Sequence, residues 1–229
     1  MPAVAAIEQL RFDRAVTVLA GDNGSGKSTI LEAVAEAIGF AAEGGELERW
    51  GELPAVPRRV IHDALIPLLT PTKPRNGYYL RAESFFNVAN LIDSDAARTP
   101  DVSIYGGVPL HQQSHGESFL ALAANRFGRD GLYLLDEPEA ALSVSGALAL
   151  LAVITRAAAA GAQFIIATHS PILLACPDAR VYELDDDGVD TPPYDELQAV
   201  SLTRGFLAAP ERYLRALQTA SEDDERPSG

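Results

Sequence analysis

A glycine-rich segment that ends in lysine and serine has the residue types of a phosphate-binding loop. The pattern G-x-x-x-x-G-K-[ST] is matched in full by Gly21, Asp22, Asn23, Gly24, Ser25, Gly26, Lys27 and Ser28. Glycines let backbone N–H groups approach phosphate oxygens because no Cβ lies in the way. We expect Lys27 to neutralise the β- and γ-phosphates of a nucleotide and Ser28 to ligate Mg²⁺, with Thr29 in the same binding segment.

Two adjacent carboxylates supply the acidic groups that nucleotide hydrolysis requires. Asp136 and Glu137 end the apolar stretch "GLYLLDEP". Asp136 is predicted to hold Mg²⁺, and Glu137 to orient or deprotonate the attacking water, a role worth typically ~10²–10⁴-fold in rate. An ordinary acidic turn ended by proline is the structural alternative. The phosphate-binding pattern earlier in the chain favours the catalytic interpretation.

Alternating strands and helices must bring these residues together. Residues 15–21 form a predicted strand, and residues 27–40 follow with apolar side chains at helical spacing. Further strands are expected at 77–86, 131–138, 162–171 and 179–188, and helices at 114–127, 146–160 and 194–218. Apolar strands that alternate with helices predict an α/β fold with a mostly parallel central sheet covered by helices on both faces. Such sheets hold ligands at the carboxyl ends of their strands, where the acidic pair falls.

One domain is predicted over residues 1–218. Residues 41–76 are rich in glycine, proline and charge, and are expected to form a loop-rich insertion with a short helix at 59–69. The acidic residues 219–229 are expected to be disordered.

Composition indicates the cellular location that we expect for the protein. A single cysteine, Cys176, excludes an internal disulfide and is typical of a reducing compartment. No basic signal sequence and no long apolar span are evident, so a cytoplasmic location without membrane insertion is expected. The net charge of −14 repels nucleic acid at long range, although a local basic patch could still bind it.

Four motifs in order resemble those of the ATP-binding cassette (ABC) ATPase superfamily. They are the phosphate-binding loop, "SHGES", "LLDEPEAALS" and "IIATHSP", and they cover roughly residues 16–180. The resemblance is to the branch that includes SMC, DNA-repair and OLD-type proteins. It implies a P-loop NTPase fold with a small helical signature region, here residues 84–130. It also implies ATP and Mg²⁺ as cofactors, and a head-to-tail homodimer that buries two nucleotides.

The resemblance assigns roles to further residues. Ser114 and Gly116 stand where the signature would contact the γ-phosphate of the partner's nucleotide, although a serine at this place could simply cap a helix. His169 resembles the switch histidine that contacts the γ-phosphate, and a turn-capping histidine is its alternative. Glu83 falls where the family usually has a glutamine near Mg²⁺, so it would bind the metal or pair with Arg81.

Two further positions depart from the family pattern. His115 replaces a glycine that transporter signatures share, and Ser143 stands near a usual aspartate of the dimer interface. Phe12 is the candidate aromatic for stacking on adenine. Base selectivity therefore rests on the resemblance alone.

These observations predict Mg²⁺-dependent ATP hydrolysis that drives dimerisation and acts on a partner protein or nucleic acid. Basic residues that could contact nucleic acid, or form a solvated loop, are Arg49, Arg58, Arg59, Lys73 and Arg75. The alternative function is the nucleotide-binding subunit of an ABC membrane transporter. A P-loop kinase and a nucleotide-gated binding module with negligible turnover are further alternatives.

Overall fold

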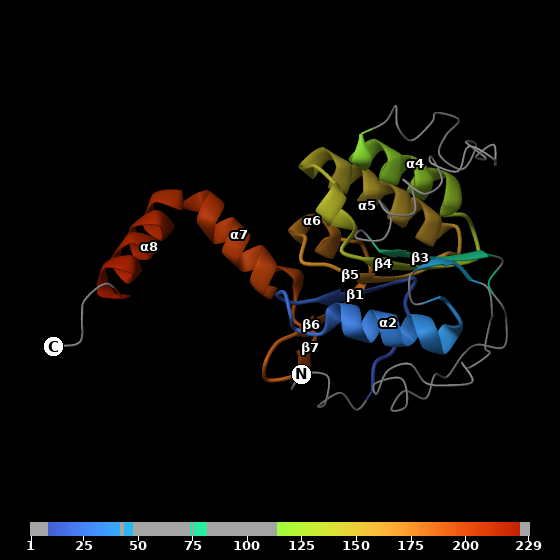
Figure 1. Ribbon diagram of the computed structural model, residues 1–229, viewed down its shortest axis with the longest axis horizontal. Coiled ribbons are helices and arrows are strands. Elements are labelled where there is room, and N and C mark those ends of the chain that lie inside the picture. Colours follow the sequence, from blue (N-terminus) through green and yellow to red (C-terminus); the bar gives the residue numbers. More distant parts are fainter. Residues whose placement is uncertain (1–8, 42–43, 48–73, 75, 82–113, 225–229) are drawn as a thin grey trace.

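A twisted, mostly parallel sheet organises the chain (Figure 1). The computed structural model describes residues 9–41, 44–47, 74, 76–81 and 114–224. Within these ranges the seven-stranded sheet has the order β2-β3-β4-β5-β1-β6-β7. Its strands are β1 (Val16–Ala20), β2 (Gly45–Glu46), β3 (Asn76–Arg81), β4 (Gly131–Asp136), β5 (Gln163–Ala167), β6 (Arg180–Leu184) and β7 (Val189–Asp190).

The five central strands run parallel, and only the short edge strands β2 and β7 run antiparallel to their neighbours. All five central strands therefore end at the same edge of the sheet. The register aligns Asp136 of β4 with Arg81 of β3 on one side and with Ala167 of β5 on the other. The α/β fold with a mostly parallel sheet, expected from the sequence, is confirmed.

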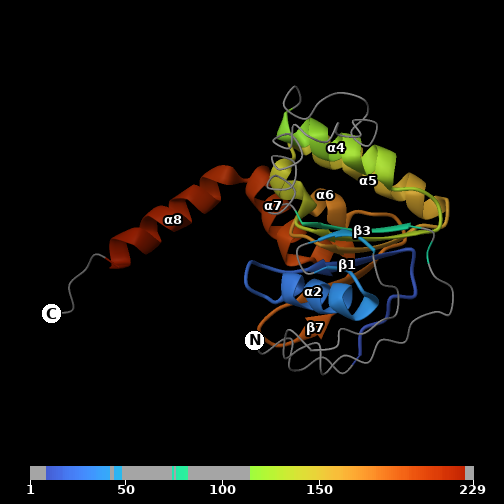
Figure 2. The same ribbon diagram turned by 45° about the vertical axis from the view of Figure 1, so that its right-hand side comes forward.

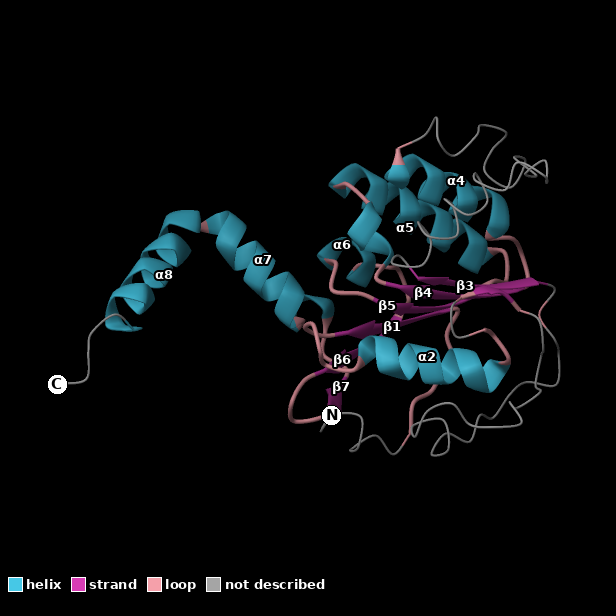
Figure 3. Ribbon diagram, viewed as in Figure 1, coloured by secondary structure: helices cyan, strands magenta, loops and turns pink. Residues whose placement is uncertain are grey.

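Helices cover both faces of the sheet (Figure 3). Helix α2 (Lys27–Ile38) covers one face, and α4 (His115–Arg126), α5 (Val144–Ala159) and α6 (Pro171–Leu174) lie on the other. Short 3₁₀ helices, η4 (Pro138–Ala141) and η5 (Tyr194–Glu196), lie in the connections.

Strand residues alternate between two apolar cores because successive side chains point to opposite faces. In β4, Leu134 packs with Ile30 and Leu31 of α2, whereas Leu135 packs with Phe119 of α4 and helix α5. Burial on both faces explains why the central strands read as continuous apolar runs. The sheet is thereby held rigid behind the edge at which the strands end.

Local sequence signals set the helix ends. Ser114 caps α4 through the backbone N–H of Glu117, whose side chain accepts a hydrogen bond from the N–H of Ser114 at 2.8 Å, which is a full capping box. Helix α5 begins at Val144, two residues before the predicted start, because the side chain of Ser143 accepts a hydrogen bond from the N–H of Gly146.

Two helices extend away from the sheet (Figure 2). They are α7 (Gln198–Ala208) and α8 (Pro210–Asp224), so the helix expected over 194–218 is divided at Pro210. Val200 anchors α7 to the core, whereas Phe206 and Leu214 are exposed. Helix α8 continues to Asp224, so residues 219–224 are helical where the sequence predicts disorder. Extending a formed helix adds one hydrogen bond per residue fixed, which offsets a weak local preference.

Several predictions fall on residues outside the described ranges. These are the helix at 59–69, most of the insertion 41–76, the signature region before Ser114 and the basic residues from Arg49 to Arg75. The strand predicted over 77–86 is described only as far as Arg81. No helix among the described residues is both long and apolar enough to cross a membrane.

Candidate active site

Three glycines shape the loop between β1 and α2. Gly21, Gly24 and Gly26 have φ angles of 137°, 84° and 103°, in the region that side chains with a Cβ rarely adopt. At Gly21 a Cβ would also collide with the carbonyl oxygen of Leu184 in β6. The loop is therefore specified by its glycines, and it leads directly into the N-terminus of α2, where backbone N–H groups and the helix dipole favour an anion.

Lys27 folds back over this loop. Its Nζ donates hydrogen bonds to the carbonyl oxygens of Gly21 and Asp22, each at 2.8 Å, and the residue is only 3% exposed. Burial lowers the pKa of the Lys27 ammonium, an effect that the nearby carboxylates of Glu137 and Glu139 oppose. A cation held beside the exposed residues of this loop is suited to a phosphate group.

Ser28 and Asp136 meet at the mouth of the loop. The Ser28 hydroxyl donates a hydrogen bond to Oδ1 of Asp136 at 2.8 Å. Arg81 lies beside them, with its Nε 3.7 Å from Oδ2 of Asp136 and a terminal nitrogen 2.9 Å from Glu32. The structure thus joins the two motifs on which the nucleotide prediction depends.

A hydroxyl and a carboxylate at this position fit Mg²⁺. This ion prefers oxygen ligands and is usually bound through one or two carboxylates together with substrate phosphates. Among the described residues no group of three or more His, Cys, Asp or Glu forms a metal cage. The donor set therefore suits a metal that arrives with a nucleotide better than one held by protein alone.

Glu137 leaves β4 in a strained conformation. Its φ of 46° and ψ of 51° are left-handed, which is uncommon for a residue with a side chain, while its N–H donates to the carbonyl of Ala167 at 2.9 Å. The conformation turns the chain sharply into η4 directly after Asp136. Oε1 of Glu137 lies 3.9 Å from Nδ1 of His169, so the predicted catalytic carboxylate and the predicted switch histidine are neighbours.

Glu139 is a site residue that the sequence reasoning missed. Its Oε1 accepts hydrogen bonds from the Thr168 hydroxyl at 2.5 Å and from the backbone N–H of His169 at 2.9 Å. The signal in the sequence was a second glutamate in "DEPEAALS", two positions after Glu137. Only the fold shows that this carboxylate reaches the segment after β5.

The signature residues lie apart from these contacts. The Ser114 hydroxyl donates to Oε2 of Glu117 at 2.7 Å, and this bond lowers the pKa of the exposed Glu117 carboxyl. A Cβ on Gly116 would lie 3.1 Å from the carbonyl oxygen of Ala141, so α4 starts against the end of η4. None of the interactions described links Ser114 or Gly116 to the Lys27 loop. Glu83 lies outside the described residues.

Phe12 packs against the core on the α2 side of the sheet, partly buried. Its carbonyl accepts a hydrogen bond from the Gln163 side chain at 2.6 Å. Its stacking on adenine stays a prediction.

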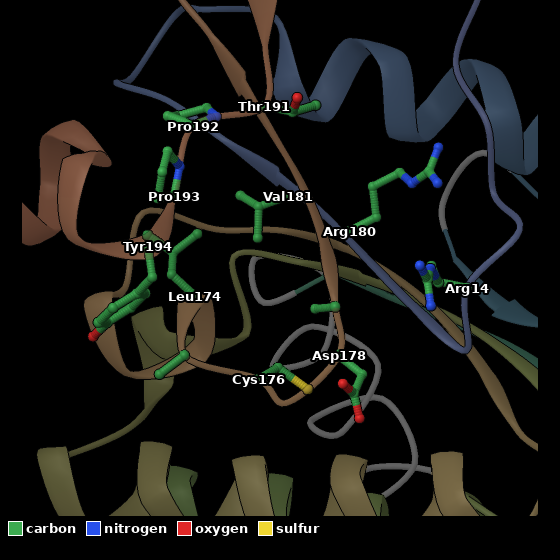
Figure 4. Close-up of a pocket in the computed structure, with 12 residues that line it drawn as sticks. Arg14, Leu174, Cys176, Asp178, Arg180, Val181, Thr191, Pro192, Pro193 and Tyr194 are labelled. Carbon is green, nitrogen blue, oxygen red and sulfur yellow. The ribbon is translucent and has the colours of Figure 1, made fainter.

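A cavity of about 740 Å³ lies at the other end of the strands (Figure 4). Its lining includes Arg14, which precedes β1, Arg180 at the start of β6, and Tyr194 of η5. The phosphate-binding loop, in contrast, contacts Leu184 at the end of β6. The cavity is therefore separate from the candidate nucleotide site.

Comparison with known families agrees with the motifs. A family model described as "AAA domain, putative AbiEii toxin, Type IV TA system" matches residues 59–175, and a second AAA-domain model matches residues 6–52. The cytochrome c biogenesis ATP-binding export protein CcmA of Salmonella typhi is 31% identical over 176 residues, covering 73% of this chain and 82% of that protein. The hemin import ATP-binding protein HmuV of Nocardia farcinica is 30% identical over 222 residues, covering 90% of this chain and 77% of that protein.

Solved structures with a similar arrangement have low sequence identity to this chain. The ADP conformation of an ATP-binding cassette of an ABC transporter aligns with a TM-score of 0.47 and 16% identity, over 84% of this chain and 86% of that one. The family match over residues 59–175 and the relationship to CcmA lead to one identification. The chain belongs to the AAA/ABC-type P-loop ATPase family, and it is an ATPase.

Proposed function

We propose that the chain hydrolyses ATP with Mg²⁺ at the loop 21–29, and that ATP drives two copies together so that they act on a partner protein or nucleic acid. The observation that carries the site is the 2.8 Å hydrogen bond from Ser28 to Asp136. It links the phosphate-binding loop to the end of β4 and puts oxygen ligands next to the buried Lys27.

Each residue then has a defined task. The Lys27 ammonium exchanges the carbonyl oxygens of Gly21 and Asp22 for phosphate oxygens, which are better partners for a buried cation. Ser28 and Asp136 would hold Mg²⁺, which supplies charge stabilisation to the phosphates. Glu137 accepts a proton from the attacking water, and His169, 3.9 Å away, interacts with the terminal phosphate.

The family resemblance and the position of α4 support the dimerisation that we propose. Ser114 and Gly116 begin this helix, and Ser114 is exposed, so the helix N-terminus is open to a nucleotide on a second copy. The capping box occupies the Ser114 hydroxyl in the single chain. We infer that this hydroxyl turns to the γ-phosphate when two copies associate.

The names of the relatives favour a second candidate function. CcmA is an export protein and HmuV an import protein, each described as ATP-binding. A role as the nucleotide-binding subunit of a transporter is therefore the alternative to a switch on a protein or nucleic acid.

The experiment that tests the site is Mg²⁺-dependent ATP turnover by the full chain, with DNA, RNA or membrane vesicles added in separate arms. Turnover that EDTA abolishes is expected. Stimulation by nucleic acid at low salt, where phosphate contacts are strongest, would support the first function. Stimulation by vesicles that contain a permease would support the second. A chain that binds ATP and never hydrolyses it under any of these conditions would contradict the proposed mechanism.

A further inference from the structure

Glu139 links the segment after β4 to the segment after β5. Its side chain, only 10% exposed, projects from η4 after β4 and binds the segment after β5. The same oxygen, Oε1, accepts from Thr168 at 2.5 Å and from the His169 N–H at 2.9 Å. The Thr168 hydroxyl oxygen in turn accepts a hydrogen bond from the Ser170 N–H at 3.0 Å.

These contacts begin where the backbone pairing ends. The β4–β5 register runs as far as Asp136 opposite Ala167, and one more hydrogen bond links Glu137 N–H to the Ala167 carbonyl. Beyond that ladder the Thr168 N–H donates to the Leu19 carbonyl of β1 at 3.0 Å, and the Ser170 carbonyl accepts from the Leu174 N–H at 3.0 Å. The strands therefore keep their register without Glu139, whereas the N–H of His169 itself donates to Glu139.

Glu139 also lies near the two residues that are proposed to act in hydrolysis. Nδ1 of His169 is 3.4 Å from Oε1 of Glu139 and 3.9 Å from Oε1 of Glu137. The His169 side chain is 47% exposed, so its own packing does little to restrain it. Glu139 thus contacts both the backbone N–H and the ring of His169.

We propose that Glu139 is a positioning residue for hydrolysis, which acts by fixing the backbone of His169 so that its ring stands next to Glu137. The inference rests on the proposed function, because His169 matters only if a terminal phosphate is cleaved there. The hydrogen bonds of Glu139 are to Thr168 and His169, so its role is argued through them. Its contribution is to remove the freedom of a loop that would otherwise hold His169 in many orientations.

Two substitutions separate hydrogen bonding from charge. Glu139→Gln keeps an oxygen acceptor for Thr168 and His169, and Glu139→Ala removes it, while both remove the negative charge. We expect Glu139→Ala to lower the kcat for ATP hydrolysis by about 10- to 100-fold, with a KM within about threefold of wild type. Glu139→Gln should restore most of kcat. Equal loss in both variants would overturn the positioning role, because charge would then be the cause.

The double variant shows whether Glu139 works through His169. If it does, Glu139→Ala combined with His169→Ala should be no slower than His169→Ala alone. Losses that multiply would mean that Glu139 acts independently, and would overturn the proposal. Glu196→Ala, at an exposed carboxylate in η5, is the matched control and should leave kcat unchanged.

Hydrogen exchange gives a readout that needs no turnover. The His169 amide should exchange faster in Glu139→Ala than in Glu139→Gln, with amides of β4 and β5 unchanged in both. If the His169 amide of Glu139→Ala exchanges at the same rate as in the wild-type protein, the inference is overturned. If the His169 amide exchanges faster in Glu139→Ala but the wild-type protein does not hydrolyse ATP, the proposed function has failed. The role of Glu139 in fixing the His169 backbone then still stands. If Lys27→Ala abolishes turnover and Glu139→Ala does not affect it, only the Glu139 inference has failed.

Discussion

Ser28 and Asp136 are 108 positions apart in the chain, yet the hydroxyl of one donates to the carboxylate of the other at 2.8 Å. The contact exists because β1 and β4 are parallel strands that flank β5 and end at the same edge of the sheet. It brings the phosphate-binding loop and the acidic strand end into one site. The predictions below test that site.

Asp136→Asn is expected to weaken the affinity of the protein for Mg²⁺ without removing ATP binding. Losing a carboxylate ligand should raise the Mg²⁺ concentration for half-maximal hydrolysis by about 10- to 100-fold. The ATP affinity measured in EDTA by calorimetry should stay within about threefold. Ser28→Ala should act on the same step, so the two substitutions together should cost less than the product of their separate effects. Independent effects would argue against a shared metal site.

Lys27→Ala should abolish ATP binding in calorimetry, because the buried ammonium is the cation that the loop holds. Undiminished affinity would contradict the assignment of the loop.

The pH dependence of ATP affinity should reflect the lowered pKa of Lys27. Only the charged ammonium attracts phosphate, so affinity should be full at about pH 7 and should fall as the pH rises through a value below the ordinary 10.5. In the free protein the same shift makes the free energy of unfolding rise with pH in that interval, because the unfolded chain binds the proton more tightly. Lys27→Arg, which keeps its charge, is the control and should bind with little pH dependence in this range. A wild-type affinity that does not change up to the ordinary lysine value of 10.5 would contradict this account.

Glu137→Gln should slow hydrolysis by about 10²–10⁴-fold while leaving the loop able to bind ATP. The trapped nucleotide should favour a dimer, which light scattering would detect at double the mass of the 24.4 kDa chain. Glu196→Gln serves as the control at an exposed carboxylate. A Glu137→Gln protein that is loaded with ATP and strictly monomeric would count against the dimer.

Gly21→Ala should destabilise the fold. The residue has a φ of 137°, and a Cβ would meet the Leu184 carbonyl oxygen, so we expect a loss of about 1–3 kcal/mol in the free energy of unfolding. Urea denaturation monitored by circular dichroism measures it. Gly188→Ala is matched, since Gly188 also has a positive φ of 147° but nothing lies within 4 Å of its Cβ position. A loss at Gly21 no greater than at Gly188 would show that the contact with β6 does not matter.

Local signals in the sequence predicted the elements of this fold well. The glycines of the loop, the apolar run before Asp136 and the capping box at Ser114 each act over a few residues, so a linear pattern suffices to recognise them. Short elements were harder to predict. The two-residue strand β2 depends on pairing with β3, and the helical turn at 219–224 depends on the helix before it.

The residue types of the candidate site were determined by the sequence alone: a lysine and serine after glycines, two adjacent acids after an apolar strand, and a histidine after another. Which of them meet was decided only by the tertiary structure. Parallel strand pairing brings Ser28 within hydrogen-bonding distance of Asp136. The left-handed conformation of Glu137 turns the chain so that Glu139 accepts a hydrogen bond from the backbone N–H of His169. Contacts between distant segments depend on strand order and register, and these are properties of the packed sheet that no short stretch of sequence contains.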